Sequence, residues 1–198
     1  MFANLDKLTI VRVGNVLSYS TLQALADRIQ GAFCGIIRHV AVSHHECPVS
    51  ESIDAFLLTM ILHAEYCGHI LGITDADLKT TDPDEFYNAI LGGKNPRNDV
   101  AVVSTRKLSP DRIATESDYQ LLVDRTLKVS LHEIGHNLGL TDHRTYAFAI
   151  DGGLCPMSKG ESNQFGYLGY VRAVVDGRGV RFCEDCTQFL RSVYHSHG

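Results

Sequence analysis

The sequence has few positive charges and no run of them. Its 198 residues include 18 Lys and Arg against 23 Asp and Glu, a formal net charge of -5, and basic residues never stand more than two together. Nucleic-acid-binding proteins concentrate Lys and Arg to neutralise phosphates, and anionic membrane surfaces attract the same clusters. We therefore expect neither nucleic acid nor a membrane as a partner.

Long apolar runs are missing as well. No stretch is long enough to cross a bilayer, and the first residues, MFANLDKLTIVRVGNV, lack the basic start, long apolar centre and cleavage site of a secretory signal. These absences predict a cytoplasmic protein, in which the six cysteines are thiols or metal ligands rather than disulfides. Cys34, Cys47 and Cys67 lack partners at ligand spacing and are expected to be buried small apolar residues.

The chain does have enough apolar material for one core. With 44% hydrophobic side chains it fits a single domain, and no feature indicates an oligomer, so we expect a monomer. Short β-branched stretches alternate with stretches of helical periodicity, which predicts an α/β fold with a twisted, mostly parallel five-stranded sheet and an antiparallel edge strand. The predicted strands are 7–16, 35–43, 69–78, 84–94 and 98–108, and the predicted helices are 18–33, 50–65, 117–138 and 182–198. Ser18 or Ser20 is the expected N-cap of the first helix, and Ser50 that of the second.

One short stretch, SLHEIGHNLGLTDHR at residues 130 to 144, concentrates polar side chains. On a helix, residues four apart lie on one face about 6 Å apart along the axis, so His132 and His136 can hold one ion. Glu133 falls near the same face and can take a proton from a metal-bound water. Gly139, three residues after the second histidine, allows a sharp turn that returns a further ligand to the metal.

This longer pattern resembles the metzincin clan of zinc peptidases, whose signature is HExxHxxGxxH followed by a methionine-containing turn. More narrowly, it is similar to the archaemetzincins, whose pattern reads HExxHxxGxxHCx4CxMx17CxxC. The chain supplies HEIGHNLGL, then CPM at Cys155 to Met157 and CEDC at Cys183 to Cys186, and LGITDADL and VVSTRKL extend the likeness over most of its length. The resemblance implies a compact metzincin-like domain with a catalytic zinc, and Met157 as the hydrophobic base beneath the histidines.

The third catalytic ligand has two possible positions. Without a gap, Asp142 stands where the family has the third histidine, and His143 where it has the first structural cysteine. Carboxylate oxygen binds zinc, histidine can replace cysteine in a structural site, and the snapalysins similarly carry aspartate at the third position. If the register slips by one, His143 becomes the catalytic ligand and Asp142 its neighbour. We favour Asp142, because the slipped register leaves only three cysteines in the second site.

The gapless register gives that second site four ligands, namely His143, Cys155, Cys183 and Cys186, and a closed set of four is structural. The spacings exceed the family's, with 11 residues between His143 and Cys155 and 25 between Met157 and Cys183, as insertions in loops would produce. The alternative for CEDC is a redox pair or two buried thiols, but no thioredoxin-like strand precedes it.

These motifs predict one zinc metallopeptidase domain over residues 1–198 with two zinc ions. Residues 1–139 would form an N-terminal subdomain with the active-site helix, and residues 140–198 a small C-terminal subdomain stapled by the second zinc. His132, His136 and Asp142 would hold the catalytic ion, and Glu133 would be the general base for hydrolysis of a peptide or protein substrate. The alternative is a zinc-stabilised binding module without turnover, which the altered third ligand motivates.

Overall fold

A five-stranded sheet forms the centre of the molecule. The computed structural model describes residues 7–33, 35–45, 51–80, 89–95, 97–110, 112–143, 147–159 and 169–194. The sheet has the strand order β2-β1-β4-β8-β7. Its strands are β1 (Lys7–Val13), β2 (His39–His45), β4 (His69–Thr74), β8 (Val100–Ser104) and β7 (Gly92–Asn95). The first four pair in parallel and β7 pairs antiparallel with β8, so the predicted mostly parallel sheet with an antiparallel edge strand is confirmed.

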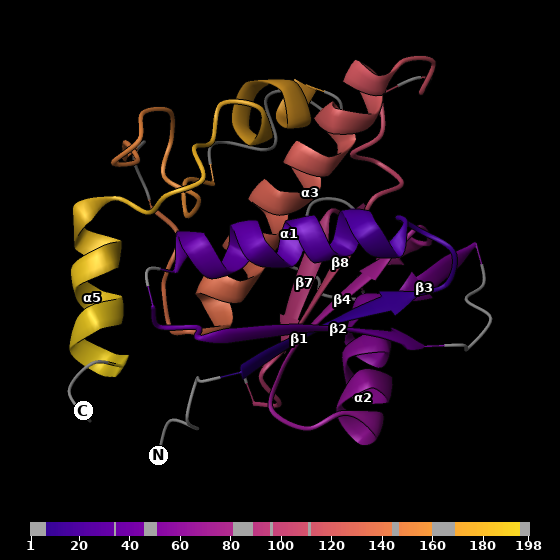
Figure 1. The fold of residues 1–198 in the computed structure, drawn as a ribbon, viewed down its shortest axis with the longest axis horizontal. Helices are drawn as coiled ribbons and strands as arrows, with labels where there is room; N and C mark the ends of the chain where they lie inside the picture. Colours follow the sequence, from indigo (N-terminus) through magenta and orange to yellow (C-terminus); the bar gives the residue numbers. More distant parts are fainter. Residues whose placement is uncertain are drawn as a thin grey trace.

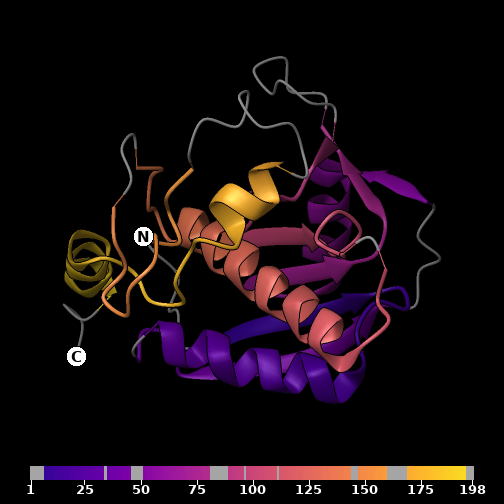
Figure 2. The ribbon, with the colours of Figure 1, turned by 90° about the horizontal axis from the view of Figure 1, so that it is seen from above.

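Helices cover both faces of this sheet (Figures 1 and 2). Helices α1 (Tyr19–Ala32) and α3 (Glu116–Asn137) pack on one face, and α2 (Ala55–Glu65) packs on the other. All six residues of β4 are buried, because this strand is central and covered on both sides. Two apolar clusters result, the larger between the sheet and α1 and α3, the smaller beneath α2.

Local sequence explains why α1 forms where it was predicted. Ser18 is its N-cap, as predicted, and its hydroxyl accepts a hydrogen bond from Thr21 N over 3.1 Å. The buried face carries Leu22, Leu25 and Ile29 at helical spacing.

The start of α2 differs from the prediction. The helix begins at Ala55 with Asp54 as its N-cap, so the cap predicted at Ser50, a residue outside the described part of the chain, is wrong. The reason is a second, three-stranded sheet of β3 (Ser52–Asp54), β5 (Asp77–Lys79) and β6 (Ala89–Ile90). Ser52–Asp54 pairs with β5 and is therefore held extended instead of helical.

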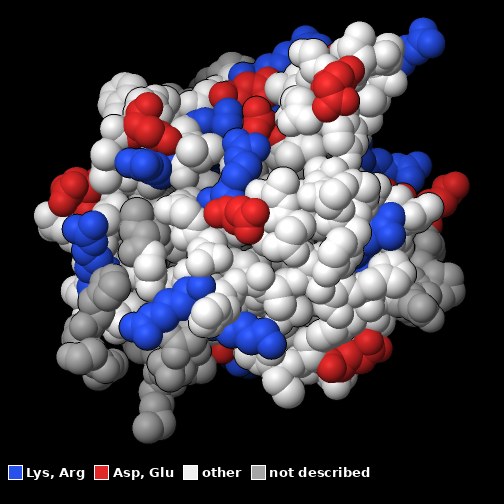
Figure 3. All heavy atoms as spheres, viewed as in Figure 1, with Lys and Arg blue, Asp and Glu red and all other residues white. Residues whose placement is uncertain are grey.

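After α3, the described residues are mostly irregular. They contain a one-turn π-helix, η2 (Val171–Val175), and end in α5 (Glu184–Tyr194), which stands beside the sheet in Figure 1. Among the described residues, no helix combines the length and apolar character that crossing a membrane requires. Basic and acidic side chains are interspersed on the face seen in Figure 3.

Candidate metal centre

Helix α3 carries the first two histidines of the motif at its carboxyl end. A capping box fixes its start, because Asp118 N donates to Thr115 Oγ1 over 3.2 Å while Thr115 N donates to Asp118 Oδ2 over 2.9 Å. The helix packs against β7 and β8. His132 and Glu133 are consequently buried, each with 8% of its surface exposed.

Backbone carbonyls orient both imidazoles. Pro156 O lies 2.9 Å from His132 Nδ1, and Leu140 O lies 3.0 Å from His136 Nδ1. Since a carbonyl oxygen only accepts, each Nδ1 must donate, and a neutral imidazole then presents an Nε2 lone pair. Burial, reinforced by the nearby charges of Arg178 and His136, places the pKa of His132 well below its usual value, so this ring is neutral near pH 7.

A turn after α3 brings Asp142 to these two nitrogens. Gly139 has φ +91°, a left-handed conformation that glycine adopts without strain, and Leu140 N donates back to Gly135 O over 2.9 Å. Asp142 Oδ1 then lies 3.2 Å from His136 Nε2 and 3.6 Å from His132 Nε2, and the two Nε2 atoms are 3.2 Å apart.

The chemistry of these three atoms fits a divalent cation. Zinc bound at about 2.0–2.2 Å to tetrahedral N and O ligands holds the ligand atoms about 3.3 Å apart. Asp142 Oδ1 is buried and accepts no hydrogen bond from any residue that the structure describes. Burial by itself would raise the pKa of Asp142, but His136, His132 and Lys159 lower it to about 2, so it is a carboxylate. Lone pairs that converge without a proton between them repel one another unless a cation lies among them.

Glu133 lies between this group and the edge strand of the sheet. A Cβ on Gly92 of β7 would lie 2.8 Å from Glu133 Oε1, so the strand passes this close only because residue 92 is glycine. Burial raises the pKa of Glu133, against the opposing charges of His136, Lys94 and Arg178. A carboxylate with a raised pKa is better matched to proton transfer near neutral pH.

Met157 supports the helix from below. A Cβ at position 135 would lie 2.6 Å from Met157 Sδ, so the glycine inside HEIGH admits the thioether against the helix backbone. Met157 is fully buried. It therefore packs against the helix between His132 and His136, as a hydrophobic base would, and that role stays a prediction.

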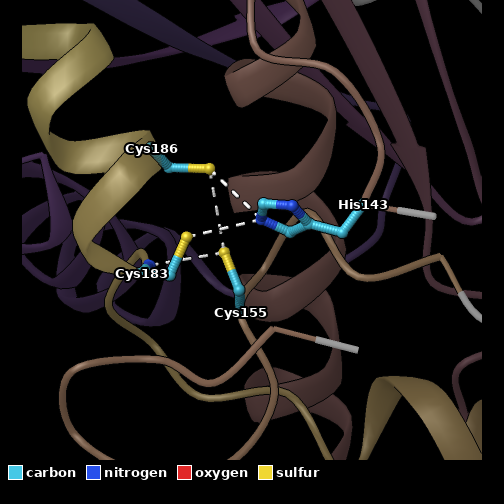
Figure 4. Close-up of side chains that lie close together, drawn as sticks. All are labelled: His143, Cys155, Cys183 and Cys186. Carbon is cyan, nitrogen blue, oxygen red and sulfur yellow. Dashed lines mark hydrogen bonds between the residues drawn. The ribbon is translucent and has the colours of Figure 1, made fainter. Parts of the chain in front are cut away.

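A second cluster gathers one imidazole and three thiols (Figure 4). His143 Nε2 lies 3.4 Å from both Cys183 Sγ and Cys186 Sγ, and Cys155 Sγ lies 4.0 Å from Cys186 Sγ. Tetrahedral zinc with bonds of about 2.3 Å to sulfur and 2.0–2.1 Å to nitrogen separates its ligands by about 3.5–3.8 Å. The three cysteines are buried free thiols in the structure.

The acidities of these thiols also suit a cation. A hydrogen bond from Cys186 lowers the pKa of Cys155 to about 5, whereas that same contact, together with burial, raises the pKa of Cys186. Burial raises the pKa of Cys183. The cluster thus ionises once by itself, and a divalent ion is needed to hold three thiolates together.

The arrangement of both clusters follows the gapless register. Asp142 faces the two helical histidines, and His143, the next residue, turns to the three cysteines. The ligand roles themselves stay predictions. Elsewhere one expectation fails, because Cys67 is exposed instead of buried, while Cys34 and Cys47 lie outside the described residues.

Three side chains near the first group were not predicted. Lys159 Nζ lies 3.7 Å from Asp142 Oδ2, and Arg178 is hydrogen-bonded to Tyr170 and to Ser158 O. Isolated in an aperiodic stretch, they carry no sequence signal. The pairing of Ser158 with His143 places Lys159 here, and the folding of residues 169–180 over α3 brings Tyr170 and Arg178.

Archaemetzincins share parts of this sequence, although no family model matches the chain. The archaemetzincin of Pyrococcus horikoshii is 29% identical over 130 residues, 64% of this chain and 57% of that protein. The archaemetzincin of Pyrococcus furiosus is 35% identical over 71 residues, 36% of this chain and 35% of that protein. The matched stretches thus span from a third to somewhat over half of these relatives.

Solved structures share the fold over nearly the whole chain. The crystal structure of archaemetzincin from Methanopyrus kandleri superposes with a TM-score of 0.69 at 22% identity, covering 94% of this chain and 93% of that one. Archaemetzincin from Archaeoglobus fulgidus, complexed with malonate, gives 0.62 at 21% identity, covering 92% and 99%. A zinc-dependent peptidase from Methanocorpusculum labreanum gives 0.64 at 18% identity, with the same coverage. The chain is thus similar to the archaemetzincins in fold over nearly all of its length and in sequence over part of it, which confirms the resemblance that its motifs predict.

Proposed function

We propose that the chain is a zinc-dependent metallopeptidase that hydrolyses peptide bonds in peptide or protein substrates. The observation that carries this proposal is the convergence of His132 Nε2, His136 Nε2 and Asp142 Oδ1 beside the Glu133 carboxylate. Three protein ligands leave a fourth zinc position for water or substrate, which is typical of catalytic rather than structural zinc. The partial identity to curated archaemetzincins supports the same activity.

The residues around this site have distinct roles in the proposed reaction. Zinc, when bound, supplies a Lewis acid that polarises the scissile carbonyl and makes a water acidic. Glu133 accepts a proton from that water as it adds to the carbonyl carbon, and then passes the proton to the departing amine nitrogen. Pro156 O and Leu140 O keep the protons of His132 and His136 on Nδ1 throughout.

We propose a second, structural zinc in the cluster of His143, Cys155, Cys183 and Cys186. Four protein ligands fill a tetrahedral shell and leave no position for water, so this ion would fix the chain after Asp142 without taking part in chemistry. Reduced thiols are required, which favours the cytoplasm as the working compartment. We propose one domain over residues 1–198 that works as a monomer, with no nucleic acid or membrane partner.

Cleavage of a peptide library by the zinc-loaded protein tests the activity. Glu133→Gln removes the base and keeps the shape, and general-base catalysis contributes about 10²- to 10⁴-fold, so cleavage should fall by that factor with zinc content unchanged. Glu116→Gln, in the exposed first turn of the same helix, is the matched control and should cleave like wild type. Equal background cleavage by wild type and Glu133→Gln would identify a binding module instead.

Zinc stoichiometry tests the two sites separately. Wild type should hold about two zinc ions per chain, whereas Asp142→Asn and Cys186→Ser should each lose one, from different sites. A wild-type content of one ion would contradict the paired sites.

A further inference from the structure

Arg178 is a buried cation for which the described residues supply no carboxylate partner. It has 4% of its surface exposed, and its Nε and Nη2 donate to Ser158 O over 3.1 and 2.8 Å. Nη2 also donates to the Tyr170 hydroxyl over 3.3 Å. Among the described residues, none places a carboxylate oxygen within 4.0 Å of it. Burying a charge costs free energy unless an opposite charge compensates it. We therefore expect Arg178 to stabilise a negative charge that is not carried by a side chain in direct contact with it.

The contacts of Arg178 place it beside the proposed catalytic group. Ser158, whose carbonyl oxygen accepts from Arg178, forms an isolated β-bridge with His143, the residue after Asp142. Lys159, the residue after Ser158, has its Nζ 3.7 Å from Asp142 Oδ2. The charge of Arg178 also lowers the pKa of His132. Through Ser158, the guanidinium is therefore held against the segment that pairs with the chain next to Asp142.

The Tyr170 hydroxyl contacts Arg178 on one side only. Its hydroxyl oxygen accepts from Arg178, and the structure provides no acceptor for its own proton among the residues it describes. Burial raises the pKa of Tyr170, the charges of Arg178 and Lys159 oppose this, and those of Asp142 and Glu133 add to it. The net shift is upward, so the phenol keeps its proton. A protonated phenol with one lone pair held by a cation is a strengthened donor.

The segment that carries this pair is firmly anchored. Arg125 Nε and Nη2 bind both carboxylate oxygens of Asp176 over 2.7 and 2.8 Å, and Lys128 Nζ donates to Asp176 O over 2.7 Å. These contacts hold η2 against α3, as Figure 2 shows. The stretch from Met157 to Cys183 has 25 intervening residues against 17 in the archaemetzincin pattern, so the pair lies where this chain departs from that pattern.

We propose that the Tyr170 hydroxyl, held and polarised by Arg178, donates a hydrogen bond to the substrate carbonyl oxygen and stabilises the negative charge that develops there when water adds. Tyr170 is then a catalytic residue, and Arg178 is the residue that positions it. The inference rests on the proposed peptidase function, because that reaction creates the oxyanion. The phenol gives up no proton, so water addition remains balanced by Glu133 alone.

Kinetics and inhibitor binding test this proposal together. Tyr170→Phe in the zinc-loaded protein should lower kcat about 100-fold or more, the usual effect of removing one oxyanion donor, with KM within about threefold and zinc content unchanged. Arg178→Lys should lower kcat less and in the same sense. The matched control is Tyr119→Phe, which loses a hydroxyl bonded to Thr21 Oγ1 over 2.8 Å near the other end of α3 and should keep wild-type kinetics.

A binding readout separates this inference from the peptidase proposal. An N-acetylated, C-amidated phosphinic peptide carries a tetrahedral anion in place of the scissile bond, so calorimetry should show it binding wild type at least tenfold more tightly than Tyr170→Phe. That result without any cleavage would uphold the contact between Tyr170 and the tetrahedral anion and would refute the peptidase, and with it the catalytic role of Tyr170. Equal binding, or a wild-type kcat in Tyr170→Phe, overturns the inference. A loss confined to the phosphinic peptide with a free carboxylate also overturns it, because the pair would then bind the substrate C-terminus.

Discussion

Asp142 and His143 are neighbours in the chain, yet they join clusters with opposite properties. Asp142 completes a group of three N and O donors, one fewer than a tetrahedral zinc takes. His143 completes a group of four that is dominated by sulfur and closed by buried thiols. One peptide bond thus separates a site suited to chemistry from a site suited to holding structure. The two sites differ in the number of protein ligands, three against four, more than in where those ligands lie in the chain.

The closed cluster should dominate stability. Few regular elements hold the residues that the structure describes after Gly139, so Cys186→Ser should release this segment. The thermal midpoint should fall by about 10 °C or more, several kcal/mol at about 2–4 °C per kcal/mol for a chain of this size. Differential scanning calorimetry of zinc-loaded protein measures this. Asp142→Asn is the companion variant, with an expected loss of activity and only a small change in the midpoint. Similar midpoints for the two variants would break the distinction between the clusters.

The open cluster should set the pH dependence of the reaction. A carboxylate ligand reduces the effective charge of zinc, so the attacking water is less acidic than with three histidines. Asp142→His should therefore move the acidic limb of the kcat/KM profile to lower pH, by on the order of one unit. An unmoved limb would count against Asp142 as a ligand.

The packing beneath the open cluster offers a smaller perturbation. Gly135→Ala would force a methyl group against Met157 Sδ and should destabilise the fold by about 1–3 kcal/mol, measured by urea unfolding. When Met157→Ala is combined with Gly135→Ala, the two losses of stability should be strongly non-additive, because the shorter side chain at 157 leaves room for the methyl group at 135. Simple additivity would mean that the two residues are not packed as described.

The cap of α3 gives the smallest effect and a control outside both clusters. Hydrogen bonds from Thr115 and Ala114 lower the pKa of Asp118 from its usual 3.8, so the folded state favours the carboxylate. That stabilisation is complete above pH 3.8 and is lost as the pH falls through the lower folded pKa. Asp118→Asn should thus be less stable than wild type at neutral pH, and the difference should shrink below pH 3.8. A difference independent of pH would exclude this cause.

Elements with strong local periodicity were predicted well. The patterns that predict α1, α3 and β8 repeat every two, three or four residues. In the structure these three elements begin and end within a few residues of the predicted positions. Ser52–Asp54 was misread as helix because its conformation depends on pairing with β5, over twenty residues away. The division of the predicted strands 69–78 and 84–94 between two sheets and the helix η2 have no local signal of their own.

The site divides in the same way. The spacing of His132, Glu133 and His136 on one helix and the turn at Gly139 are local properties, so the sequence by itself determined that two imidazoles would share one face with a carboxylate near it. The approach of Arg178 and Tyr170 to that face depends on long-range contacts, chiefly those of Asp176 with α3. Only the tertiary structure decided it, because helical and strand periods relate residues a few positions apart, whereas buried charges are positioned by whatever the whole chain packs around them.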